Sequence, residues 1–583
     1  MPKNKGPQWA KDAVWYQIFP ERFCRTNSHN PITAADIEGT TPFSLTHNDS
    51  WKIHSWTADW YATDECEKQN TADLKTNILR RRFCGDVNGI ISKLEYLKDL
   101  GVNALYFTPL QYSPSLHKYD ATNYLHTDPF FGSNPRADIK TIENEDFDNY
   151  ANATWTTADR ETLNLIKRAH ELEIKIIFDG VFNHIGYNSV PFQDVLKHRE
   201  KSKYASWFHI NFEKSTPKQL LYDKFWGCVK EMPKLNYDCK EVQRYIFAAL
   251  RRWLRPVVDG KEMPGIDGWR IDHAIGVPIE FWNKAHRYVK MLNSDALFIG
   301  ELIEPEDIIK PYLNQGIFDS VMNYGCLEAA CRFFAAEKKY YTAEQFDQRL
   351  KELLNLYPTE CNYMMQNMLG THDTERIASY IVNRRLKQYG SIGKFFANSH
   401  ADDKHYRTRK PFERERLIQK MMIVFQFAFV GAPMIYYGDE AGMWGANDPD
   451  CRKPMMWSEI KFDNEYPVFN GIRGRKPDKV EFSQEMHRFY KKIIALRNNY
   501  QALRTGKWRT IEASQQGRLY IFERYTNQQR VIFAFNRNKT PQTFTIEDNL
   551  QSSLTDYLTD SKYLSVKGKY EITIEPSTVL VLI

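Results

Sequence analysis

Residues 160–182, RETLNLIKRAHELEIKIIFDGVF, contain a helical pattern followed directly by a β-rich apolar run. Apolar residues three and four apart are typical of a helix with one buried face, and the short apolar run has strand length. Seven further β-rich runs occur, and most of them adjoin a stretch with helical periodicity. They cover residues 13–19, 103–110, 265–271, 296–303, 319–325, 363–373 and 433–440.

This alternation predicts an α/β fold in which parallel strands are joined by crossover helices. Eight such strands close into a (β/α)8 TIM barrel. A doubly wound open sheet is the alternative, but no glycine-rich phosphate loop follows the first predicted strand. We therefore expect the barrel.

Two regions depart from the barrel pattern. Residues 185–243 follow the third predicted strand and are irregular and rich in aromatic residues and lysine, so we expect an inserted subdomain over the active face. Residues 505–583 contain period-two runs separated by polar turns, which predicts a C-terminal antiparallel β-sandwich domain. The barrel itself is then predicted from residues 1–184 and 244–504.

Composition excludes several classes of protein. A net charge of +6 over 583 residues, with no basic run interleaved with aromatics, argues against a nucleic-acid partner. Nine irregularly spaced cysteines without a C-x-x-C motif argue against a disulfide framework or a zinc site. The first residues lack the apolar core of a secretory signal, and the apolar stretch 421–438 is broken by polar and helix-breaking residues. We expect a cytoplasmic protein without a membrane span.

Polar side chains follow the ends of several predicted strands, where the active site of a barrel lies. They are Asp179, Asn183, His184, Arg270, Asp272, Glu301, His372 and Asp373. Alternation along a strand sends Arg270 and Asp272 to the same side. Taken alone, this pair is explained equally well by a structural ion pair. A single acid at a strand end is explained equally well by a helix cap. Several carboxylates that converge on one rim instead indicate glycoside cleavage by a paired nucleophile and acid.

Four motifs resemble, in order and spacing, the signature regions of the α-amylase family of glycoside hydrolases (family thirteen). They are DGVFNH (179–184), GWRIDHA (268–274), GELI (300–303) and GTHDTER (370–376). VWYQIFPERF (14–23) and NDPDCRKPMMW (447–457) add further matches. MPKLN (232–236), in the expected inserted subdomain, resembles the neopullulanase, cyclomaltodextrinase and maltogenic amylase branch.

The resemblance implies that Asp272 is the nucleophile, Glu301 the general acid/base, and Asp373 the acid that holds ring hydroxyls and stabilises the transition state. Arg270 then orients Asp272 and keeps its pKa low, so that the nucleophile is ionised. Glu301 needs the opposite treatment, a raised pKa that keeps it protonated near neutrality.

The resemblance also implies a set of substrate-binding residues. His117, His184 and His372 match residues that hydrogen-bond the sugar, Tyr119 matches the ring that stacks on it, and a core role is equally open for Tyr119. Asp179 matches an acid that supports the arginine. The chemistry requires no cofactor, although Asn183 matches a position that ligates structural calcium in many amylases.

The expected activity is that of a retaining α-glucan hydrolase, which cleaves α-1,4 bonds of cyclomaltodextrins, maltooligosaccharides or pullulan by double displacement. A transglycosylase or an exo-acting α-glucosidase using the same residues is an alternative, and a non-catalytic amylase-like binding protein is another. The expected partner is thus an α-glucan oligosaccharide or cyclodextrin.

Two of the departures of this sequence from that branch bear on its assembly and its substrate. The branch usually carries an N-terminal β domain used in dimerisation, whereas this chain reaches its first predicted strand by residue 13, so its oligomeric state does not follow from the resemblance. The branch usually has a Trp-His pair after the general acid, where this chain has Leu302 and Ile303. The loop around Phe208, Phe212 and Trp226 is a candidate source of replacement aromatics.

Overall fold

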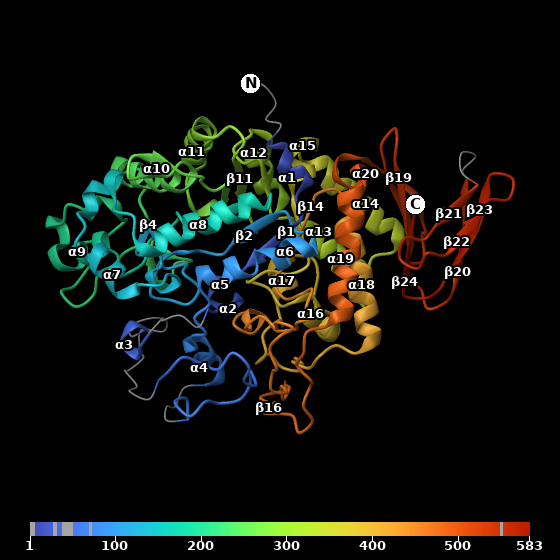
Figure 1. Cartoon of the computed structure of the whole chain (residues 1–583), viewed down its shortest axis with the longest axis horizontal. Helices are drawn as coiled ribbons and strands as arrows, with labels where there is room; N and C mark the ends of the chain where they lie inside the picture. The colour runs from blue at the N-terminus through green and yellow to red at the C-terminus, as the bar shows by residue number, and fades with distance from the viewer. Residues whose placement is uncertain (1–5, 27–31, 38–50, 69–72, 548–551) are drawn as a thin grey trace.

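The computed structural model describes residues 6–26, 32–37, 51–68, 73–547 and 552–583 (Figure 1). Its central sheet has eight parallel strands in the order β12-β11-β10-β5-β2-β1-β14-β13. The eight strands are β1 (Trp15–Ile18), β2 (Ala104–Phe107), β5 (Lys175–Gly180), β10 (Gly268–Ile271), β11 (Leu297–Gly300), β12 (Ser320–Val321), β13 (Gln366–Met368) and β14 (Ala432–Tyr436). A parallel bridge between Met322 and Gln366 connects the two outermost strands, so the sheet closes into the predicted barrel.

The predicted barrel helices are confirmed, and local sequence explains their limits. In α8 (Thr157–Glu171) the side chain of Thr156 caps the N-terminus and that of Asp159 returns to the Thr156 backbone. This reciprocal capping satisfies backbone N–H groups that would otherwise lack partners. Beside the other apolar runs lie α5 (Val87–Ser92) and α6 (Leu94–Leu100), α11 (Ile279–Leu292) and α18 (Glu413–Ala428), and α19 (Gln484–Asn499) with α20 (Gln501–Thr505) precedes the C-terminal residues.

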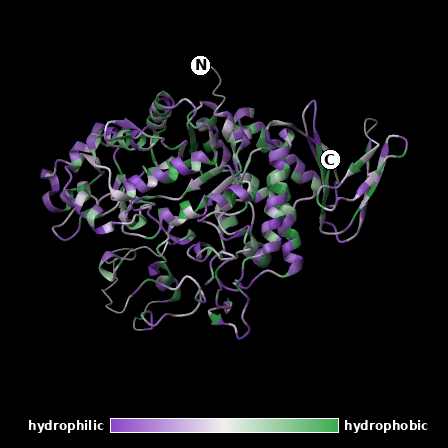
Figure 2. Cartoon of the chain, in the orientation of Figure 1, coloured by the Kyte–Doolittle hydropathy of each residue, from purple (hydrophilic) through white to green (hydrophobic). Residues whose placement is uncertain are grey.

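Apolar residues concentrate on the strands and on the helix faces turned toward them (Figure 2). All four residues of β10 are buried, as are all five of β14. No helix among the described residues combines the length and apolarity that crossing a bilayer requires. The apolar stretch 421–438 forms the end of α18 and the whole of β14, as its sequence predicts.

Part of the segment between β5 and β10 lies at the C-terminal ends of the barrel strands. It contains α9 (Val190–His198), a hairpin of β6 (Lys224–Phe225) and β7 (Val229–Pro233), and α10 (Lys240–Leu254). Bridges pair His184 with Lys234 and Phe208 with Leu235, so MPKLN lies beside the end of β5. This contact fixes the hairpin at the rim of the barrel.

The C-terminal residues form the predicted antiparallel β structure. A four-stranded sheet contains β17 (Lys507–Ala513), β18 (Leu519–Tyr525), β19 (Arg530–Asn536) and β24 (Thr578–Leu582). Two pairs accompany it, β20 (Gln542–Glu547) with β23 (Lys569–Ile574) and β21 (Ser553–Thr555) with β22 (Lys562–Leu564). Strand β17 is not evident from the sequence, because its residues are only partly buried and a bulge interrupts their alternation.

A further structured region that the sequence analysis does not anticipate lies between β1 and β2. Its α4 (Leu74–Arg80) and the preceding loop share an apolar cluster of Trp60, Tyr61, Ile78 and Phe83 with the distant Val468. The Trp60 indole N–H donates to Asp450 Oδ1 at 3.0 Å, which ties this region to the segment that follows β14. In Figure 1 it is the blue segment below the barrel.

Candidate active site

A cavity of about 650 Å³ opens at the C-terminal ends of the barrel strands. Its wall includes six of the ten residues that the sequence singles out: His117, Tyr119, His184, Asp272, Glu301 and Asp373. The other four, Asn183, Asp179, Arg270 and His372, are buried behind that wall. Strand geometry explains the difference for β10, where Arg270 lies within the strand and Asp272 follows its end.

Arg270 is the centre of the charge cluster. Its Nη1 donates to both oxygens of Asp179, at 2.7 and 2.8 Å, and to Asp272 Oδ1 at 3.0 Å. Its Nη2 forms an ion pair with Glu301. Strand register explains the first contact, since Arg270 on β10 lies beside Asp179 on β5. One buried guanidinium therefore holds three carboxylates, one from the end of each of three neighbouring strands.

Burial, together with the neighbouring carboxylates, raises the pKa values of Asp272 and Glu301. Burial, followed by the charge of Glu301, raises the pKa of Asp272 well above its usual range, although Arg270 acts in the opposite direction. Burial likewise raises the pKa of Glu301 against the effect of Arg270. The expectation that Arg270 keeps the pKa of Asp272 low is therefore wrong, because burial and the charge of Glu301 outweigh the effect of Arg270. The raised pKa expected for Glu301 is confirmed.

Asp373 lies among cationic and hydrogen-bonding groups that favour its ionised form. Burial raises its pKa, but His372 and Arg452 outweigh that effect and hold it well below its usual range. His372 Nε2 lies 3.0 Å from Asp373 Oδ2, and Arg452 Nη2 lies 3.1 Å from Oδ1. Asp373 is thus ionised while Asp272 and Glu301 hold protons more readily.

The histidines divide into two groups. His372 is fully buried, with Nδ1 accepting from Gln17 Nε2 at 2.8 Å and Nε2 facing Tyr119 and Asp373, so it holds its neighbours in place rather than lining the cavity. His117 and His184 do line it, and burial lowers the pKa of each to about 4, which leaves both neutral at pH 7.

Tyr119 joins these two groups through its hydroxyl and its ring. The hydroxyl donates to Asp179 Oδ2 at 3.0 Å, and the ring stacks on His372 with centroids 5.4 Å apart. His184 Nε2 donates to the Tyr119 carbonyl at 2.9 Å. One edge of Tyr119 thus supports the acid cluster, and the residue also forms part of the cavity wall.

Sequence reasoning missed three supporting residues. Arg452 belongs to the matched motif NDPDCRKPMMW, yet its contact with Asp373 depends on packing. Tyr106 donates to Asp179 Oδ2 at 2.7 Å and Gln17 orients His372, both from strand interiors. Polar side chains inside predicted apolar strands were the available signal.

The inserted hairpin contributes aromatic residues to the cavity. Phe225 and Trp226 stack with centroids 4.5 Å apart, and both line the wall. Trp226 remains 73% exposed. Of the three aromatics proposed from the sequence, Trp226 thus reaches the cavity, whereas Phe208 is buried against Phe192 and Phe212 packs on the core.

Comparison with known proteins places this site in a family. The family model described as the alpha amylase catalytic domain matches residues 17–145, 143–397 and 390–506. The chain is 33% identical to neopullulanase 2 of Thermoactinomyces vulgaris over 99% of its own length and 78% of that protein. It is 34% identical to the cyclomaltodextrinase of Geobacillus thermopakistaniensis over 92% of its own length and 70% of the relative. The chain belongs to the α-amylase family.

A solved structure agrees with this assignment. A cyclomaltodextrinase structure aligns with a TM-score of 0.70 at 29% identity and covers 99% of this chain and 79% of that one. The protein is therefore a glycoside hydrolase of the α-amylase family, similar to the neopullulanase, cyclomaltodextrinase and maltogenic amylase branch that MPKLN indicates.

The calcium position expected from the family is Asn183. Its Oδ1 is buried without a hydrogen-bond partner, which suits a ligand oxygen. Calcium takes six to eight oxygen ligands and usually includes carboxylates. Among the described residues, no group of three His, Cys, Asp or Glu ligands gathers around Asn183. Calcium at Asn183 stays a prediction from the sequence.

Proposed function

We propose that this family member is a retaining α-glucan hydrolase that cleaves α-1,4-glucosidic bonds. The observation that supports this most directly is the arrangement of Asp272 and Glu301 around Arg270. Both carboxylates contact terminal nitrogens of the same guanidinium, and both line one cavity. Acids held this close suit the retaining mechanism, which needs a separation of roughly 5 Å, better than the wider spacing of inverting enzymes.

In the proposed reaction, Asp272 attacks the anomeric carbon and forms a glycosyl ester while the glycosidic bond breaks. Glu301 donates its proton to the leaving oxygen. The ionised Glu301 then takes a proton from water, whose oxygen displaces Asp272 from the sugar. The second step restores both groups, so no proton is lost or gained over the cycle.

The reactive form requires one proton on the Asp272 and Glu301 pair. Since burial raises both pKa values, the pair retains a proton to higher pH than exposed carboxylates do. With that proton on Glu301, Asp272 keeps the hydrogen bond from Arg270 and is free to attack. The ionised Asp373 is proposed to hold ring hydroxyls and to stabilise the positive charge that develops at the anomeric carbon.

The inserted hairpin supports a preference for short or cyclic glucans. Trp226 and Phe225 lie on the cavity wall with Ile303, the second residue after Glu301. They offer an apolar stacking surface where the branch usually has its Trp-His pair, and the hairpin narrows the approach for long chains. Relatives named neopullulanase and cyclomaltodextrinase agree with this choice. We propose cyclomaltodextrins and maltooligosaccharides as the preferred substrates, with weaker cleavage of pullulan.

Two measurements test the proposal. Initial rates on β-cyclodextrin, maltotriose, pullulan and soluble starch at equal glucose-unit concentration should favour the first two, and random mid-chain cleavage of starch would contradict this. Proton NMR in the first minutes should show products released as the α-anomer, since two inversions retain configuration. Initial release of the β-anomer would exclude Asp272 as nucleophile. Dominant transfer to sugar acceptors would instead identify a transglycosylase, and glucose as first product an exo-acting α-glucosidase.

A further inference from the structure

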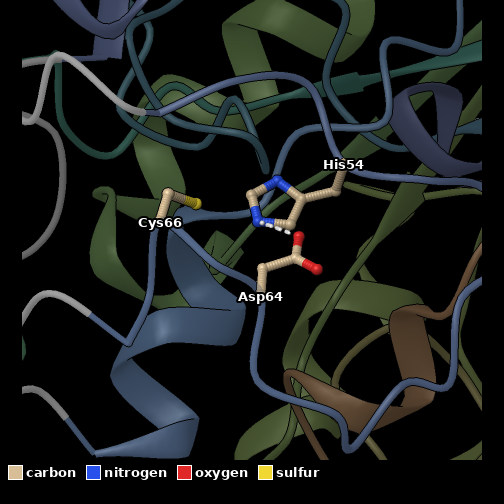
Figure 3. A group of neighbouring side chains, drawn as sticks. All are labelled: His54, Asp64 and Cys66. Carbon is tan, nitrogen blue, oxygen red and sulfur yellow. Dashed lines mark ion pairs between the residues drawn. The ribbon is translucent and has the colours of Figure 1, made fainter.

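Three side chains that commonly ligate metals converge outside the acid cluster, in the region between β1 and β2 (Figure 3). One ligand atom each of His54, Asp64 and Cys66 lies within 4.8 Å of the other two. No second group of His, Cys, Asp and Glu with this geometry occurs in the described part of the chain. Figure 3 shows the Cys66 sulfur and the Asp64 carboxylate both directed at the His54 ring.

The nitrogen–oxygen separations agree with tetrahedral coordination. His54 Nε2 lies 3.1 Å from Asp64 Oδ2 and 3.5 Å from Glu67 Oε1. Bonds of about 2.0 to 2.1 Å from a tetrahedral zinc ion would hold such nitrogen and oxygen atoms roughly 3.3 Å apart. The nitrogen and both oxygens therefore require only small movements to surround an ion.

Burial gives an independent reason to expect a ligand. His54 and Cys66 are 5% and 6% exposed, and His54 Nε2 faces the carboxylates of Asp64 and Glu67. Carboxylates that converge on a buried nitrogen need a proton or a cation between them, and a metal ion would supply that positive charge. The side chain of Asp64 is 41% exposed, which leaves a route for the ion from solvent.

The charges around the cluster suit a divalent cation. An ionised Asp64 and a Cys66 thiolate would together balance a charge of two. Glu67 is already paired with Arg81, whose Nε and Nη2 lie 2.7 and 2.8 Å from its two oxygens. Arg81 also donates to the carbonyl of Ala62 at 2.7 Å, so the loop that carries Asp64 and Cys66 is held in position.

We propose that His54, Asp64 and Cys66 bind a zinc ion, with Glu67 or a water molecule as the fourth ligand. A mixed set of nitrogen, sulfur and carboxylate oxygen favours zinc over calcium or magnesium, which prefer oxygen alone. Binding forms one bond from each ligand to the ion, and the Cys66 thiol proton passes to solvent. The absence of a C-x-x-C motif argues against a zinc site made of paired cysteines, but it does not exclude this group, which contains a single cysteine.

The proposed role of the ion is structural. It would fasten the loop that carries Trp60, whose N–H donates to Asp450 Oδ1. Asp450 lies two residues before Arg452, which contacts Asp373 at the catalytic cavity. Zinc would therefore stabilise the support of the cavity rim without touching substrate, and the inference does not depend on the proposed reaction.

The test uses the full-length protein, stripped with a chelator, reloaded with zinc or cobalt and passed through gel filtration. We expect one zinc per chain by elemental analysis and a higher melting temperature with zinc, because an ion that binds the folded state stabilises it. In Cys66→Ser and His54→Ala, zinc affinity should fall by more than the roughly 10- to 100-fold typical of losing an outer-shell partner. Cys228→Ser, which alters an exposed cysteine, should bind as the wild type does.

Cobalt separates this site from adventitious histidine binding, even if a variant fails to fold. The wild-type cobalt protein should show the near-ultraviolet charge-transfer band of a cobalt-thiolate bond, and Cys228→Ser should retain it. Substoichiometric zinc after gel filtration, or a cobalt spectrum without a thiolate band, would overturn the proposal. Equal zinc affinity in wild type and Cys66→Ser would do the same.

Discussion

Two buried arginines in this barrel contact carboxylates in opposite ways. Arg270 contacts three carboxylates, those of Asp179, Asp272 and Glu301, beside an open cavity. Arg376 contacts one carboxylate, Asp439 Oδ1 at 2.8 Å, and otherwise donates to backbone carbonyls. The number of acids for each cation distinguishes a site built for chemistry from an ion pair that holds segments together.

The difference has a physical cause. A closed one-to-one pair neutralises itself, and removal of either partner leaves a buried charge, which costs several kcal/mol. A cluster with surplus acids repels itself unless some acids hold protons, so it is tolerated where a reaction uses them. Mutations in the Arg270 cluster should therefore reduce activity, and mutations in the second cluster, Arg376 with Asp439 and the adjacent Glu440, should reduce stability.

The largest expected effect is on turnover in Asp272→Asn. An amide cannot form the glycosyl ester, so kcat should fall by about 10⁴ or more. The melting temperature should not fall, since the change removes one of the acids that compete for Arg270. Initial rates on β-cyclodextrin and a thermal unfolding curve check both points. Retention of a third of the wild-type turnover with a lowered melting temperature would assign this pair to the structural class instead.

The barrel shows how far sequence reasoning extends. Each of the eight apolar runs chosen from the sequence overlaps a buried strand. The polar residues at their ends meet because parallel strands end at one rim. Asp272 and Glu301 were predictable from this rule and from their motifs. The direction of the Asp272 pKa shift was not predictable, because it depends on how deeply packing buries the carboxylate and on which acids it brings close.

Other contacts depend on loops, where spacing in the sequence says little about distance. Trp226 enters the cavity because the hairpin pairs back onto the end of β5, while the nearby Phe208 turns into the core. His54 meets Cys66 through an irregular loop whose residues match no spacing rule. These placements follow from tertiary packing, which a single sequence does not specify.

The second largest effect is expected on stability in Asp439→Asn. Arg376 would lose the partner that balances its buried charge, and breaking such a pair costs about 3 to 5 kcal/mol. Chemical denaturation measures the loss, while kcat of the folded protein should change less than tenfold. Asp259→Asn is the matched control, because Asp259 pairs with Arg160 at 3.0 Å on the surface. That control should cost at most about 1 kcal/mol. An equally small loss in Asp439→Asn would remove the contrast between the clusters.

A smaller effect, on substrate binding, is expected in Trp226→Ala. Stacking of a planar ligand on an aromatic side chain is worth about 1 to 3 kcal/mol by analogy with bases on aromatics. This corresponds to a decrease of about 5- to 150-fold in kcat/KM on maltotriose or β-cyclodextrin. Trp226→Phe keeps a ring at this exposed position and should lose much less. If both variants match the wild type, the acceptor side of the cavity does not use this residue.

The last expected effect is the pH dependence of stability contributed by Glu440, next to Asp439. Glu440 is fully buried and accepts from the hydroxyls of Tyr16 and Tyr96, each at 2.8 Å. Burial raises its pKa from 4.5 to about 7. Because the folded pKa exceeds the unfolded one, this group stabilises the fold fully below about pH 4.5 and ceases to do so as pH rises through 7.

Glu440→Gln removes this titration while keeping a polar side chain of the same shape. The melting temperature of the wild type, relative to the variant, should therefore decrease between pH 4.5 and 7.5, by only a few degrees because a kcal/mol moves the midpoint of a long chain by roughly 2 °C or less. Taking the difference between the two proteins cancels Asp272, Glu301 and Asp439, which titrate in both. A constant difference across this range would mean that Glu440 is ionised throughout, stabilised by its two tyrosine donors, and that the second cluster also carries an acid without a cation.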